Sequence, residues 1–134
     1  MRYKRLLDAE NSISHLGDFV SATLDSYLQG LPYGIYHVTN PGAVTTRLVV
    51  DMIQEERARR IRENLEQPFP ESFDFFESEE EFMKIAANTP RSNCVLDTRK
   101  ILRSGIHLRP VEEAIREALQ NWIPESSNST LPSS

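Results

Sequence analysis

The stretch that most constrains the fold is residues 34–42, Gly-Ile-Tyr-His-Val-Thr-Asn-Pro-Gly. Its β-branched and aromatic residues favour a short strand over residues 34–39. The Asn-Pro-Gly sequence at 40–42 ends that strand, because proline cannot donate to a ladder and glycine accepts a turn conformation. Thr45 or Thr46 can then cap a helix. We therefore predict a strand–turn–helix corner, which is either purely structural or an anion site at a helix N-terminus.

Apolar residues recur at helical spacing in several other parts of the chain. The helix that follows the corner is amphipathic only in its first half. Its second half, from Glu55 to Glu66, is mostly charged and is expected to project from the body or to rest on something outside this chain. Ser78 and Glu81 form a capping-box pattern at the start of another helix. With short extended pieces between them, the predicted helices span residues 18–30, 46–65, 79–88, 98–104 and 110–122, the last with proline at its first position.

Length and charge limit the functional class. The 134 residues suffice for one domain, expected over residues 1–123, and the Ser-rich residues 124–134 are expected to be a disordered tail. A net charge of -5 argues against a nucleic-acid-binding surface. No apolar run reaches the length of a membrane span, and Cys94 is the only cysteine, so we expect a cytoplasmic protein with no disulfide framework.

Most motifs that indicate catalysis are absent from the sequence. It contains no nucleophile elbow, no P-loop and no Gly-rich dinucleotide fingerprint, so no catalytic residue is assigned. Its three histidines do not have metal-ligand spacing, and we predict no metal site. His15 and Asp18 are three residues apart, which fits either a hydrogen-bonded pair or the start of a helix. His37 is expected to be a satisfied core or edge histidine.

The best chemical candidate is the polar segment after the predicted helix 79–88. There Arg91 is followed by Ser92 and Asn93, and a guanidinium beside two small polar side chains suits a phosphate or a sugar hydroxyl. The alternative is a surface arginine in a polar turn.

Several motifs, taken in order, resemble one enzyme family. They are residues 34–42 followed by Thr45 and Thr46, the run Pro-Arg-Ser-Asn-Cys-Val-Leu-Asp at 90–97, and Leu-Arg-Pro at 108–110 before a helix ending at Trp122. From about residue 3 to 122 the chain resembles the C-terminal part of extended short-chain dehydrogenases, in the NAD-dependent epimerase/dehydratase superfamily. It is most similar to dTDP-4-dehydrorhamnose reductase and the related nucleotide-rhamnose epimerase/reductases.

The resemblance implies an α/β fold without a complete Rossmann domain: a helix-rich C-terminal portion with short strands. Complete family members bind NADP or NAD on an N-terminal Rossmann domain and reduce the keto group of a nucleotide-linked 6-deoxy sugar, using a Tyr-x-x-x-Lys pair. Four residues after the tyrosines at 3, 27, 33 and 36 lie leucine, leucine, histidine and asparagine. The chain therefore departs from the catalytic pattern, and no cofactor is expected on it.

The resemblance places Arg91 at the family arginine that faces the nucleotide-sugar, with Ser92 and Asn93 beside it. Asn40 matches a mainly architectural region. These matches imply a truncated, substrate-binding portion of a nucleotide-sugar oxidoreductase, inactive alone, whose partner is a missing Rossmann domain or a second copy. The alternative hypothesis is a small non-catalytic interaction or dimerisation module.

Overall fold

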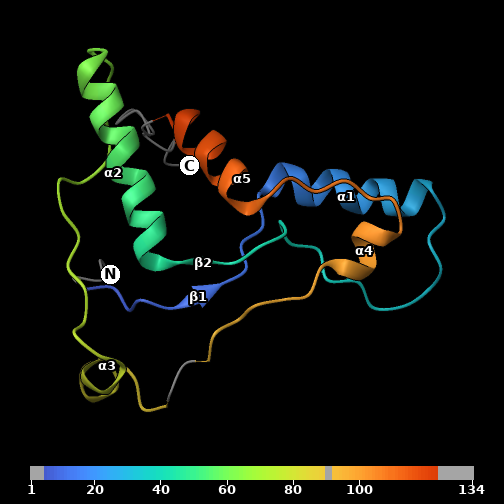
Figure 1. Cartoon of the computed structure of the whole chain (residues 1–134), viewed down its shortest axis with the longest axis horizontal. Coiled ribbons are helices and arrows are strands. Elements are labelled where there is room, and N and C mark those ends of the chain that lie inside the picture. The colour runs from blue at the N-terminus through green and yellow to red at the C-terminus, as the bar shows by residue number, and fades with distance from the viewer. Residues whose placement is uncertain (1–4, 90–91, 124–134) are drawn as a thin grey trace, which may run out of the picture.

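A computed structural model describes residues 5–89 and 92–123 of the chain. Within these ranges it contains five helices and one two-stranded sheet (Figure 1). The expected tail at 124–134, Pro90 and Arg91 lie outside the described residues. The elements are β1 (Glu10–Asn11), α1 (Leu16–Leu28), β2 (Val44–Thr45), α2 (Thr46–Arg62), α3 (Glu79–Ile85), α4 (Arg99–Arg103) and α5 (Val111–Gln120).

The small sheet joins the N-terminal segment to the start of α2. β1 pairs antiparallel with β2, with Glu10 opposite Thr45 and Asn11 opposite Val44. Single parallel bridges extend this pairing, from Asn11 to Cys94 and from Leu6 to Phe75. The described chain thus has short strands, several helices and no complete Rossmann sheet, which confirms the predicted α/β class.

The predicted strand at 34–39 does not form. The segment passes between α1 and β2 without pairing to any described strand. Tyr36 and Val38 pack against a buried cluster of Ala22, Ile101, Ile106 and Leu108. His37 is exposed, so its prediction as a satisfied core or edge residue is wrong. Strand-forming residues are present, but a strand requires a hydrogen-bonded neighbour, which this segment lacks.

The helix boundaries follow their predicted capping signals with small shifts. The Thr45 hydroxyl accepts from the Leu48 amide at 3.1 Å and begins α2. The Ser78 hydroxyl accepts from the Glu81 amide at 3.1 Å, as a capping box requires. The Glu81 carboxylate does not return the bond to Ser78; it accepts from the Glu77 amide at 2.8 Å. The local sequence therefore predicted where these helices begin, and only one of the two hydrogen bonds of the predicted capping box forms.

The charged second half of α2 does not project from the body; it packs against the end of α5. Glu56 and Arg60 are both buried, and Arg60 Nε donates to Glu56 Oε1 at 2.8 Å. The Arg60 guanidinium also donates to the carbonyls of Leu119, Gln120 and Trp122 at 2.9–3.1 Å. Helix ends leave carbonyl groups without intrahelical partners, so Arg60 acts as a side-chain cap for α5.

Candidate functional site

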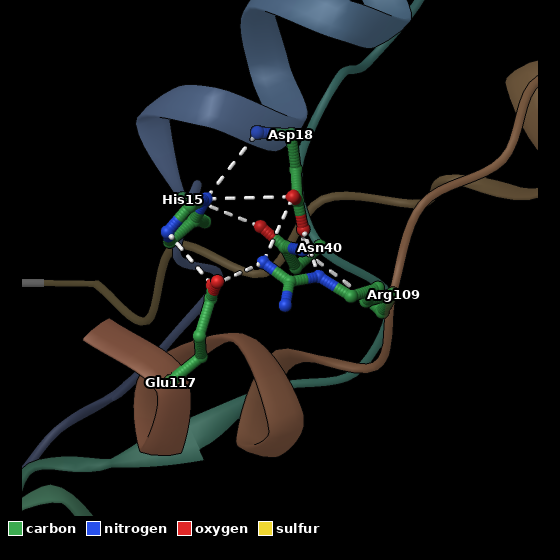
Figure 2. Close-up of polar contacts among 5 residues, drawn as sticks. All are labelled: His15, Asp18, Asn40, Arg109 and Glu117. Carbon is green, nitrogen blue, oxygen red and sulfur yellow. Dashed lines mark hydrogen bonds and ion pairs between the residues drawn. The ribbon is translucent and has the colours of Figure 1, made fainter. Parts of the chain in front are cut away.

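A polar cluster joins α1, the turn before β2, and α5 (Figure 2). Its five members are His15, Asp18, Asn40, Arg109 and Glu117. Local sequence sets each position: His15 is the N-cap of α1, Asp18 lies in its first turn, and Glu117 lies on α5. Asn40 and Arg109 each precede a proline, which ends an extended segment and fixes the following turn. Five residues from distant parts of the chain therefore meet at one place.

Asn40 is the centre of the cluster and is only 1% exposed. Its Oδ1 accepts from the His15 backbone amide at 2.7 Å. Its Nδ2 donates to Asp18 Oδ2 at 2.7 Å and to the Arg109 carbonyl at 3.0 Å. A buried amide that meets three partners in this way fixes all three segments relative to one another.

Arg109 supplies the positive charge of the cluster. Its Nε and Nη2 donate to the two carboxylate oxygens of Asp18, each at 2.9 Å, in the bidentate arrangement typical of arginine–carboxylate pairs. Its Nη2 also donates to Glu117 Oε2 at 2.8 Å. The Arg109 hydrogen bond is the main cause that holds the pKa of Asp18 below its usual 3.8, and the two carboxylates raise the pKa of Arg109.

His15 lies between the two carboxylates. Its Nδ1 accepts from the Asp18 amide at 3.3 Å and lies 3.4 Å from Asp18 Oδ1, and its Nε2 lies 3.4 Å from Glu117 Oε2. The predicted alternatives for the His15–Asp18 pair, a hydrogen bond or a helix start, are therefore realised together. Every member of the cluster has a partner within it, so these contacts fix the positions of α1, the turn before β2 and α5 relative to one another.

An apolar cavity of about 320 Å³ lies beside the cluster. His15 and Asn40 form its polar edge, and α5 contributes most of its apolar wall. The lining residues are Ile13, Ser14, His15, Leu16, Asn40, Val111, Ala114, Ile115 and Ala118.

Two of the sequence-predicted binding residues, Ser92 and Asn93, lie outside this cluster. Asn93 lines a second cavity, of about 220 Å³, together with Asp8, Arg47 and Ser78. Asn93 Oδ1 accepts from the Glu10 amide at 3.3 Å, and Ser92 is exposed. Arg91 lies outside the described residues. The structure thus places Asn93 at a cavity, and neither Ser92 nor Asn93 belongs to the polar cluster around Asn40.

The N-terminus of α2, the possible anion site of the predicted corner, already binds a carboxylate of this chain. The Arg47 amide donates to Asp8 Oδ1 at 3.1 Å, and the Arg47 side chain is paired with the same carboxylate at 3.3 Å. The position for an anion is therefore filled by Asp8. A β-carbon on Gly42 would lie 3.1 Å from Val111 Cγ1, so the turn is also packed closely against α5. These residues do not fit the phosphates of a dinucleotide cofactor.

Sequence reasoning treated Asn40 as architectural and Arg109 as the residue before a helix, and it did not connect either to Glu117. The available signal was weak: two polar residues, each preceding a proline at the end of an apolar segment. Among the described residues, no group of three or more His, Cys, Asp or Glu side chains is placed to hold a metal ion. No helix of the described ranges is long and apolar enough to cross a membrane.

We expect Asp18→Asn to weaken the dependence of stability on acid pH. Because the pKa of Asp18 is lowered in the folded state, its ionised form contributes stability above pH 3.8 that is lost as the pH falls through the lowered value. Urea unfolding at a series of pH values measures this slope. Asp25→Asn, on the exposed side of the same helix, is the matched control. Equal slopes for parent and Asp18→Asn would contradict the role given to the Arg109 pair.

Comparison with known proteins gives one structural match. No protein-family model matches the chain, and no curated protein matches its sequence. Among solved structures, it is similar to the L780 UDP-rhamnose synthase from Acanthamoeba polyphaga mimivirus, with a TM-score of 0.68 and 23% sequence identity. The similarity covers 88% of this chain but only 37% of the viral protein. The chain therefore has the fold of a part of that protein and spans well under half of its length.

Proposed function

We propose that the chain is the substrate-binding portion of a nucleotide-sugar reductase or epimerase-like protein. The observation that carries the proposal is the structural similarity to a UDP-rhamnose synthase over 88% of the chain. The motifs at 34–42, 90–97 and 108–110 support the same class of substrate through their resemblance to the nucleotide-rhamnose reductases. The finer assignment, a dTDP-linked 4-keto-6-deoxy sugar, rests on that resemblance alone.

The proposed binding residues are Arg91, Ser92 and Asn93. Asn93 and Ser78 offer amide and hydroxyl groups at the second cavity, where sugar and ribose hydroxyls can find hydrogen-bond partners. Arg47 adds a cation whose guanidinium lies over the Phe75 ring, 4.4 Å from its centroid. In this proposal the Arg91 guanidinium binds the diphosphate, since arginine recognises phosphate oxygens with two parallel hydrogen bonds.

The chain is not expected to turn over substrate alone. Its sequence has no Tyr-x-x-x-Lys pair and no Gly-rich cofactor loop, and the N-terminus of α2 is filled by Asp8. In the proposal, NADP or NAD binds to another domain, which supplies the hydride. This chain contributes only groups that bind and orient the sugar nucleotide.

A reductase assay tests the expected inactivity. The purified chain is incubated with NADPH and either dTDP- or UDP-4-keto-6-deoxyglucose, and NADPH absorbance is followed. The viral UDP-rhamnose synthase, assayed in parallel, shows that the substrate is competent. We expect oxidation of NADPH by the viral enzyme and none by this chain above the rate without protein. Turnover by the chain would refute the proposal that it lacks the catalytic machinery.

A second candidate function is a non-catalytic interaction or dimerisation module. It is favoured by α1, on which large apolar side chains, including Leu16, Leu24 and Leu28, are exposed. Size-exclusion chromatography with light scattering, with and without a nucleotide-sugar, distinguishes the two functions. A dimer indifferent to the ligand supports the interaction module, whereas a monomer stabilised by the ligand supports the substrate-binding portion.

A further inference from the structure

The cavity that contains Asn93 is already formed in the chain, because hydrogen bonds hold its walls together. The Phe76 amide donates to the Leu6 carbonyl at 2.9 Å, which joins the segment before α3 to the N-terminal segment. The Glu10 amide donates to Asn93 Oδ1 at 3.3 Å and brings in the segment before α4. A ligand therefore meets a cavity of about 220 Å³ that is preformed, as most small-molecule sites are.

Carboxylates dominate the charge of this cavity. Asp8, Glu77 and Glu79 line it, and Arg47 is the one basic residue among its described lining residues. The Arg47 guanidinium is paired with Asp8 at 3.3 Å, so these two charges offset each other. Within the described ranges, the side chains of Glu77 and Glu79 have no hydrogen-bond or ion-pair partner. Two uncompensated carboxylates repel an anionic group of a ligand, whether a phosphate or another carboxylate.

The same lining suits the hydroxyl groups of a neutral sugar. Each sugar hydroxyl can donate to a carboxylate oxygen, and Glu77 and Glu79 provide such acceptors. Asn93 Nδ2 has no acceptor in the part of the chain that the structure describes, so it can donate to a sugar oxygen. The Ser78 oxygen accepts from a backbone amide at 3.1 Å, and its proton remains available. Donors and acceptors are therefore both present, without a free cation for a phosphate.

The apolar side of the cavity favours a hexose over the ribose. Leu7, Ala9 and the buried ring of Phe76 line this side. They can pack against the C–H face of a hexose or the methyl group of a 6-deoxy hexose. The hexose is also joined to the rest of a sugar nucleotide by one bond only, so it can enter while the diphosphate stays outside. The ribose is linked to a base on one side and to the diphosphate on the other.

We propose that this cavity binds the neutral hexose of a sugar nucleotide and excludes a hexuronate, and that Glu77 and Glu79 set this selectivity. The inference rests on the proposed function, because it takes the ligand to be a sugar nucleotide. It adds which part of the ligand enters the cavity and which charge the cavity excludes.

Matched ligands that differ in one charged group test the selectivity. UDP-glucose and UDP-glucuronate differ only at C6, which carries a hydroxymethyl group in the first and a carboxylate in the second, and the dTDP-linked sugars form a second pair. Each is titrated into the purified chain and binding is followed by NMR. We expect the glucuronate to bind at least about tenfold more weakly than the glucose of the same pair. The effect is limited to this size because Glu77 and Glu79 are exposed to the screening of the solvent.

A double variant, Glu77→Gln with Glu79→Gln, assigns the selectivity to these side chains. Glutamine keeps an acceptor oxygen and the shape of the side chain but removes the charge. The glucuronate should then bind within about threefold of the glucose, whose own affinity should change by no more than about twofold. Glu80→Gln is the matched control, since Glu80 is exposed on the same helix and does not line the cavity. It should leave the preference for glucose as it is in the parent.

The amide signals of Ser78 and Asn93 report which moiety enters. UDP-glucose should shift both signals, and UDP, which lacks the hexose, should shift neither. Equal affinities for glucose and glucuronate, a preference that the double variant leaves unchanged, or equal shifts with UDP would each overturn the inference. In all three cases a sugar nucleotide still binds and the proposed function stands. Binding of none of the four sugar nucleotides would overturn both.

Discussion

Arg60→Met is expected to lower the free energy of unfolding by about 3–5 kcal/mol, the range for removing one partner of a buried ion pair. The variant keeps the apolar stem but removes the guanidinium that pairs with Glu56 and caps the end of α5. The pKa of Glu56 is lowered to about 2, first by the Arg59 hydrogen bond and further by Arg60. The buried carboxylate would retain only Arg59, and the α5 carbonyls would lose their donor.

Urea unfolding followed by circular dichroism measures this loss. Arg62→Met is the matched control, because Arg62 lies on the exposed side of the same helix and should change stability by no more than about 0.5 kcal/mol. Arg60→Lys keeps the charge but loses the forked geometry of the guanidinium. Its loss of unfolding free energy is expected to lie between those of Arg60→Met and Arg62→Met. If Arg60→Met and Arg62→Met have equal midpoints, Arg60 does not hold α2 to α5.

Asn40→Ala is expected to lower the free energy of unfolding by about 3 kcal/mol, because it leaves buried hydrogen-bonding groups on three segments without their partner. The His15 amide loses its acceptor, and Asp18 and the Arg109 carbonyl lose a donor. Asn88→Ala, at an exposed asparagine, is the control. A stability loss no larger than that of the control would show that Asn40 does not hold the cluster together.

Asn40→Asp gives an independent test of the same cluster. It preserves the shape of the side chain but places a carboxylate oxygen where the Nδ2 donor meets Asp18 Oδ2 at 2.7 Å. Two adjacent carboxylates repel one another, so one of them takes up a proton more readily. The variant should therefore lose the most stability, relative to the parent, at neutral pH and recover part of it as the pH is lowered. A deficit that does not change with pH would contradict the Asp18 contact.

Much of the local structure could be predicted from the sequence. The Thr45 cap, the start of α3 at Ser78 and the start of α5 after Pro110 depend on neighbouring residues, and local patterns identified them. The predicted strand at 34–39 failed for a different reason. Its residues favour a strand, but pairing depends on a neighbour that the described chain does not supply, and no local pattern encodes that absence.

The contacts between distant segments could not be predicted in the same way. Arg60 and Glu56 belong to the charged half of α2, which was expected to project from the body or to rest on something outside this chain, yet they are buried because the end of α5 lies over them. Asn40 and Arg109 are 69 positions apart and meet only in the folded chain. Arg91, Ser92 and Asn93 were predicted from the sequence as binding residues. The structure places Asn93 at a cavity. The binding role of all three stays a prediction.

Calorimetric titration of the purified chain with dTDP-rhamnose and with UDP-rhamnose tests the central claim most directly. We expect saturable binding of at least one of them with a dissociation constant of about 0.1–1 mM. The affinity is expected to be weak because this chain supplies only part of the proposed binding site. Arg91→Ala should abolish this binding, and Arg62→Ala should not change it. No binding of either sugar nucleotide at several times that concentration, on the order of 5 mM, or equal binding by Arg91→Ala and the parent, would contradict the claim that this chain is a nucleotide-sugar-binding portion.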